Sequence, residues 1–176
     1  MSNITLLPGN GVHNRDWIEQ VQSSIGGNIL YYEHWSSGAS TMNIDVETER
    51  LAEVASGKPI RVFAKSAGAI LAMKAVRGAS VELEKAVFVG TAVNWGIKLG
   101  LPIRAWLEEW KVPTLFIQKE HDRAFFAGEL STLLSGRYEL LVLPGEDHDY
   151  LEFDQYIPRV QATLIQDSLS DGKTVY

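Results

Sequence analysis

The 176-residue sequence contains no cysteine, and this absence excludes several kinds of chemistry at once. Disulfide bonds, thiolate nucleophiles and cysteine zinc sites all need the missing side chain. A chain without cysteine suits a reducing compartment, so we expect a cytoplasmic protein.

Long apolar runs and runs of one charge are also missing. No apolar stretch is long enough to span a bilayer, and the opening MSNITLLPGNG lacks the basic flank and apolar core of a signal peptide. The 16 Lys and Arg against 22 Asp and Glu give a formal net charge of -6, without a cluster of either sign. We therefore expect neither a membrane nor a nucleic-acid partner, but a small molecule. The sequence indicates no oligomeric state.

The composition is that of a globular protein, with 45% hydrophobic and 22% charged residues and no internal repeat. The length allows one domain with a sizeable core and is too short for two ordinary domains. We therefore predict a single domain over residues 1–176, in which the polar segment 168–176 is a candidate flexible tail.

Six short apolar runs alternate with helix-like segments along the chain. The runs are rich in β-branched and aromatic residues and span 4–7, 28–35, 60–64, 85–90, 113–118 and 138–143. The helix-like segments span 14–25, 45–56, 67–77, 102–110, 123–135 and 154–168. This alternation predicts an α/β fold, a doubly wound, mainly parallel six-stranded sheet with helices on both faces. Ligands in such sheets bind beyond the carboxyl ends of the strands, so the loops there are the candidate site.

The segment AKSAG, residues 64–68, lies where the third apolar run turns into a helix. Such a turn exposes a serine hydroxyl above the sheet, and the small side chains at Ala64 and Gly68 leave room for it. The backbone N–H of Ala67, at the start of the helix, can point at a developing negative charge. Ser66 is therefore a candidate nucleophile; the alternative is a serine that only caps the helix.

A serine nucleophile needs a base beside it and an acid that orients the base. Asp122 follows the fifth apolar run and His148 follows the sixth, which gives the order Ser, acid, His typical of nucleophile-elbow proteins. Of the four histidines, only His148 fits this order. Glu120, on the same short loop as Asp122, is the rival acid.

The Gly-rich turn PGNG, residues 8–11, follows the first apolar run. There the backbone N–H of Asn10 or Gly11 can supply a second oxyanion donor. A dinucleotide loop is the alternative, but the last glycine of GxGxxG is absent. The segments 120–122 and 146–149 carry His and carboxylates without the two-His spacing of zinc hydrolases, so we predict neither a metal nor a cofactor.

With these residues in this order, the chain resembles the α/β-hydrolase superfamily. It looks most like small, nearly lidless serine hydrolases of the retinoblastoma-binding-protein-9 type, which share a PGNG-like turn and a Ser, Asp, His triad. The resemblance implies that Ser66 is the nucleophile, Asp122 the acid and His148 the base. It also implies backbone oxyanion donors at Ala67 and at Asn10 or Gly11.

The sequence departs from that family pattern in two ways. Ala64 stands where the family usually has glycine, and the chain has no room for two further N-terminal strands or a large cap. Only residues 91–111 could form a cap, and there we expect Trp106 and Trp110 to pack as core. Four residues are candidate substrate contacts, namely His34, Trp35, Lys65 and Trp95. For Lys65 the alternatives are attraction of an acidic substrate group and projection into solvent, which we favour.

The resulting prediction is a carboxylesterase-like serine hydrolase. It would cleave a small ester or thioester through an acyl-enzyme. The alternative is a non-catalytic protein that keeps the same fold and binds a protein or a small ligand.

Overall fold

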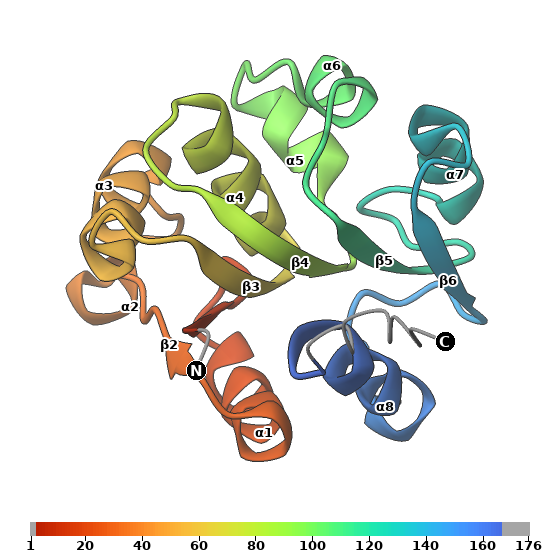
Figure 1. Cartoon of the computed structure of the whole chain (residues 1–176), viewed down its shortest axis with the longest axis horizontal. Coiled ribbons are helices and arrows are strands. Elements are labelled where there is room, and N and C mark those ends of the chain that lie inside the picture. Colours follow the sequence, from red (N-terminus) through yellow and green to blue (C-terminus); the bar gives the residue numbers. More distant parts are fainter. Residues whose placement is uncertain (1–2, 167–176) are drawn as a thin grey trace, which may run out of the picture.

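The computed structural model describes residues 3–166, which form a six-stranded parallel sheet between two layers of helices (Figure 1). The strand order is β2-β1-β3-β4-β5-β6. The strands are β1 (Ile4–Leu7), β2 (Asn28–Ile29), β3 (Ile60–Lys65), β4 (Leu83–Val89), β5 (Thr114–Lys119) and β6 (Glu139–Leu143). The predicted α/β architecture is confirmed. The strand order reverses between β1 and β3, where Leu7 and Ala64 lie side by side, so a crevice is expected beyond these two strands.

Helices cover both faces of the sheet. They are α1 (Asn14–Ile25), α2 (His34–Ser37), α3 (Ile44–Ala55), α4 (Ala67–Arg77), α5 (Val93–Lys98), α6 (Ile103–Glu108), α7 (Ala127–Leu134) and α8 (Phe153–Leu164). Figure 1 shows α1 and α8 on one side of the sheet and α3 to α7 on the other. The core is divided in the same way, since Phe63 packs with α1 and α8 while its neighbours Val62 and Ala64 face α4. All six residues of β3 are buried, as expected of a central parallel strand.

The second strand is much shorter than predicted. The apolar run 28–35 pairs with β1 only at Asn28 and Ile29, and α2 already begins at His34. Between them the chain leaves the sheet, and Tyr32 is buried with its hydroxyl donating to the Pro8 carbonyl at 2.6 Å. Tyr32 therefore supports the turn after β1 and does not extend an edge strand.

The predicted helix 102–110 ends early, at Glu108. Trp110 follows it, 3% exposed, and its indole N–H donates to Thr114 Oγ1 at 2.8 Å. The core role predicted for Trp110 is confirmed, while Trp106 is half-buried against the same core. Residues 91–111 form α5 and α6, which pack on α4 over the sheet.

Two predicted helix boundaries also shift. The predicted helix 123–135 contains a turn up to Phe126 before α7 begins, and the last helix ends at Leu164. The predicted tail 168–176 lies outside the described residues. Within residues 3–166, no helix is both long and apolar enough to cross a membrane. The same residues hold no cluster of three or more His, Asp or Glu side chains placed to bind a metal ion.

Candidate active site

Ser66 lies at the junction of β3 and α4 in a conformation that is rare for residues with a side chain. Its φ is 55° and its ψ is −117°, and its backbone N–H donates to the Val89 carbonyl at 2.8 Å. Such a conformation costs about 1–3 kcal/mol and is typically kept at functional sites. The Ser66 side chain makes no capping hydrogen bond to α4. The helix-cap alternative therefore has no support in the geometry.

His148 contacts both Ser66 and Asp122. Its Nε2 lies 2.7 Å from Ser66 Oγ, and its Nδ1 lies 2.8 Å and 3.0 Å from the two carboxylate oxygens of Asp122. Asp122 is fully buried, whereas the imidazole is 34% exposed. Glu120 is 61% exposed and lies near His121, so it is not the carboxylate that faces His148. The structure thus brings together three side chains from the loops after β3, β5 and β6.

The Asp122 carboxylate has further donors that sequence reasoning missed. Tyr150 donates its hydroxyl to Oδ2 at 2.6 Å, and the Gln118 amide lies 3.3 Å from the same oxygen. The backbone N–H of Ala124 donates to Oδ1 at 2.8 Å. Tyr150 is only two residues beyond the predicted histidine, yet nothing in the sequence indicates that its ring turns inward. Together with His148, these donors fix the orientation of the buried Asp122 carboxylate.

The PGNG turn lies directly against the start of α4. A Cβ at Gly68 would lie 2.4 Å from the Leu7 carbonyl oxygen and 2.7 Å from the Pro8 carbonyl oxygen, so only glycine fits there. The close approach places the turn beside the first residues of α4, where Ala67 N–H has no acceptor within the helix. The turn after β1 and the first turn of α4, which Ser66 precedes, are therefore in close contact.

Asn10 is held by the segment that follows β2. Its carbonyl accepts hydrogen bonds from the His34 and Trp35 rings, each at 2.7 Å. Its side-chain Oδ1 accepts from Met42 N–H at 2.8 Å and from the Thr41 hydroxyl at 3.3 Å. The residues after β2 thus fix the peptide that was predicted as an oxyanion donor.

The predicted substrate contacts fall into different settings. His34 and Trp35 hold Asn10 and also line a cavity of about 330 Å³ between the turn and α2, together with Gly11, Val12, His13, Gly38, Ala39 and Ser40. Trp95 is partly buried against the core on the α4 side. Its role toward a substrate stays a prediction.

Lys65 differs from its predicted position. It is 4% exposed, so the prediction that it projects into solvent is wrong, and its ammonium is not at the surface to attract a substrate. The ammonium donates to Asn14 Oδ1 at 3.0 Å and to the Asp149 carbonyl at 3.2 Å, and it lies 4.6 Å from the centre of the Trp17 ring. Burial lowers the pKa of Lys65 from 10.5 to about 8. The Lys65 side chain points into the protein because both of its hydrogen-bond acceptors lie there.

Solved structures share this arrangement of strands and helices. A protein assigned as a YdeN-like hydrolase, from Pectobacterium atrosepticum, superposes with a TM-score of 0.72 at 14% identity over 93% of this chain and 90% of its own. A protein assigned to the α/β hydrolase superfamily, from Xanthomonas campestris, gives 0.63 at 16% identity over 92% and 96%. A cold-adapted esterase from an Arctic intertidal metagenomic library gives 0.61 at 16% identity over 93% and 82%.

The chain has the α/β-hydrolase fold. No protein-family model and no curated protein sequence matches it. The identities are low, so the likeness concerns the fold alone, in the minimal six-stranded form that the sequence predicted.

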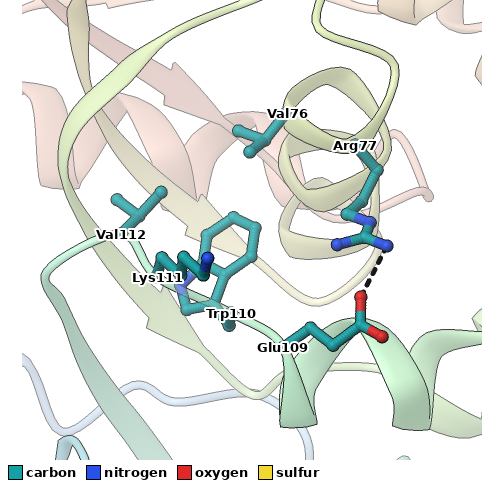
Figure 2. Close-up of a pocket in the computed structure, with 6 residues that line it drawn as sticks. All are labelled: Val76, Arg77, Glu109, Trp110, Lys111 and Val112. Atoms are coloured by element: carbon teal, nitrogen blue, oxygen red, sulfur yellow. Dashed lines mark ion pairs between the residues drawn. The ribbon is translucent and has the colours of Figure 1, made fainter.

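Two further cavities differ in their relation to Ser66. One of about 290 Å³ lies beside His148 and is lined by Arg123, Glu146 and Asp147. Another, of about 390 Å³, is shown in Figure 2, where Arg77 pairs with Glu109 at 2.7 Å across its rim. Arg77 ends α4 whereas Ser66 precedes its first residue, so this second cavity lies at the far end of the helix. Of the two, only the cavity beside His148 adjoins the candidate active site.

Proposed function

We propose that the protein is a serine hydrolase that cleaves small carboxylic esters or thioesters through an acyl-enzyme. The observation that carries the proposal is the continuous hydrogen-bond chain from buried Asp122 through His148 to Ser66 Oγ. A serine in a strained elbow, a histidine and a buried carboxylate are the parts that nucleophilic acyl transfer needs. Hydrolases and esterases among the proteins of the same fold support the class of reaction.

In the first step, Ser66 Oγ attacks the carbonyl carbon of the substrate while His148 Nε2 takes the hydroxyl proton. Asp122, held against Nδ1 of the ring, stabilises the imidazolium that forms. The carbonyl oxygen becomes an oxyanion, and we assign its stabilisation to backbone N–H groups of Ala67 and of Asn10 or Gly11.

The tetrahedral intermediate then collapses. The bond to the leaving alcohol or thiol breaks, His148 donates its proton to that group, and the acyl group stays on Ser66 as an ester. Water then attacks the acyl carbon and gives a proton to His148. The bond between the acyl carbon and Ser66 Oγ breaks, His148 returns the proton to Oγ, and a carboxylic acid is released. No cofactor takes part in these proposed steps.

A fluorophosphonate probe with intact-mass analysis tests the proposal. We expect one label per chain in the wild-type protein and none in Ser66→Ala, while Ser131→Ala, which removes an exposed serine from α7, labels like the wild type. Hydrolysis of acetyl and butyryl p-nitrophenyl esters and of an acetyl thioester should fall about 10⁴-fold to 10⁶-fold in Ser66→Ala. Turnover of the whole panel no faster than that of Ser66→Ala would overturn the proposal and favour a non-catalytic binding protein.

A further inference from the structure

The hydroxyl of Tyr150 occupies a fully buried position between the loop after β5 and the end of β5 itself. It accepts a hydrogen bond from the backbone N–H of Lys119 at 2.8 Å and lies 2.6 Å from Asp122 Oδ2. A backbone N–H can only donate, so it takes a lone pair of the phenol oxygen, and the phenol proton is directed at the carboxylate. The polarity of the Tyr150–Asp122 hydrogen bond is therefore fixed by the backbone of β5.

We propose that Tyr150 is a positioning residue that, through its hydrogen bond to Asp122, sets the orientation of this carboxylate and the affinity of His148 for a proton. The catalytic consequence rests on the proposed serine hydrolase function. The effect on His148 does not, because it is a property of the folded protein without substrate.

Contacts with several neighbouring residues fix the position of Tyr150. Its φ is +56°, and its carbonyl accepts the Trp17 indole N–H at 3.0 Å and the Tyr156 hydroxyl at 2.6 Å. A Cβ at Gly90, on the loop after β4, would lie 2.6 Å from the Tyr150 ring, so a glycine there leaves room for it. A backbone conformation this rare is kept only where its surroundings impose it. These contacts aim the hydroxyl at Asp122.

The ring of Tyr150 also contacts the base. It meets the His148 imidazole edge to face, with ring centres 5.9 Å apart and an angle of 81° between the planes. Tyr150 thus packs its ring against the His148 ring and donates its hydroxyl to Asp122, the carboxylate that bonds His148. A side chain that touches two members of the hydrogen-bond chain can couple their geometry.

The electrostatic consequence has a definite sign. Burial, followed by the nearby Asp122 carboxylate, raises the pKa of Tyr150 far above its ordinary value, so the hydroxyl keeps its proton and donates at every pH of interest. Donation draws negative charge from the carboxylate, which weakens its attraction for the imidazolium. Other charged groups around Tyr150 stay in place when only its hydroxyl is removed; these are Lys119, Asp147, Glu152, Asp149 and Lys65.

The test is an NMR titration of the His148 ring signals in two matched variants. Tyr150→Phe removes the hydroxyl that donates to Asp122, whereas Tyr138→Phe removes a hydroxyl that donates to the Trp110 carbonyl, in the core on the other face of the sheet. We expect the titration midpoint of His148 to move to higher pH in Tyr150→Phe and to stay within experimental error in Tyr138→Phe. No movement in Tyr150→Phe, or equal movement in both variants, would overturn the proposal.

A shape-preserving replacement covers the case in which Tyr150→Phe does not fold. 3-Fluorotyrosine placed at position 150 by nonsense suppression keeps the ring and makes the phenol a stronger donor. The His148 midpoint should then move to lower pH, opposite in sign to the phenylalanine variant. A change in packing alone predicts no such reversal of sign, and an unchanged midpoint in the fluorinated protein would contradict the proposal.

Turnover adds a separate readout. If the enzyme is active on the ester panel, Tyr150→Phe should lower kcat about 10-fold, the usual worth of one hydrogen bond to a charged group, with a smaller change in KM. The acid limb of the kcat/KM profile should move in the same direction as the NMR midpoint. Absence of any turnover would count against the hydrolase proposal only, since the NMR titration would still decide the role of Tyr150.

Discussion

At the scale of single residues, Gly68 shows how tightly the elbow is packed. A side chain there would meet the carbonyl oxygens of Leu7 and Pro8, both of which belong to rigid backbone beside the proposed oxyanion turn. The neighbouring Ser66 is already strained. A methyl group added at position 68 therefore has no room, and the PGNG turn must move to accommodate it.

We predict that Gly68→Ala lowers the free energy of unfolding by about 1–3 kcal/mol, as overpacking of a tight contact does. It should also reduce ester turnover, because the turn is pushed away from Ala67. The matched control is Gly128→Ala in α7, where a new Cβ meets nothing within 4 Å and alanine favours the helix by about 0.5–1 kcal/mol. Urea denaturation of the two variants measures the difference. A Gly68→Ala protein as stable as the wild type would show that the turn yields easily.

At the scale of elements, the segment from α2 to the start of α3 forms a brace for the PGNG turn. Asn10 is the centre of this brace, since its side chain bonds Ser40, Thr41 and Met42 and its carbonyl accepts two ring N–H groups. A turn that is fixed before the substrate arrives needs no reorganisation when the oxyanion forms.

We predict that Asn10→Ala lowers kcat about 10-fold with little change in KM, because the backbone donor remains but its position is less well fixed. Thr41→Val is the control: it removes only the 3.3 Å hydrogen bond to Asn10 and should change kcat less than twofold, since that bond is long and exposed. Steady-state kinetics on one p-nitrophenyl ester give both values. Equal kcat values for wild type and Asn10→Ala would contradict a role for the brace.

The same elements show what the sequence could and could not predict. The central strand β3 is rich in buried apolar residues and was predicted within one residue. Ser66, Asp122 and His148 lie in the loops after three strands of the parallel sheet, so their proximity followed from the fold. The prediction of a strand over 28–35 failed because Tyr32 is buried beneath the turn after β1, and a buried loop residue has the same local composition as a strand residue. The inward turns of Lys65 and Tyr150 depend on acceptors far away in the chain, and no local pattern encodes them.

At the scale of the whole molecule, a buried cation links the two loops that flank Ser66. Lys65 joins Asn14, which begins α1 after the PGNG turn, to Asp149, next to the proposed base. The ammonium has lost much of its hydration in this position, and that loss weighs against the charged form in the folded state only. The stability of the entire fold is therefore linked to the titration of this one group.

The pKa of Lys65 is about 8 in the folded protein and 10.5 when the chain is unfolded, so between these values the unfolded state binds more protons. The free energy of unfolding must then rise with pH. Relative to Lys65→Met, which does not titrate, we expect the wild type to gain about 2 kcal/mol between pH 7 and pH 9.5. Burial raises the pKa values of Tyr150 and Tyr156, so above pH 10 these two residues lower the free energy of unfolding as pH rises. The measured range therefore ends below pH 10.

Urea denaturation at several pH values measures this gain, and the difference between the two proteins cancels the other titrating groups. Lys98→Met provides the control, since Lys98 is exposed and its loss should leave the pH dependence as in the wild type. A wild-type protein whose stability relative to Lys65→Met stays flat from pH 7 to pH 9.5 would mean that Lys65 holds its proton as firmly as a lysine in water. The hydrogen bonds to Asn14 and Asp149 would then offset the whole loss of hydration, and the two loops would be joined by a cation throughout that range.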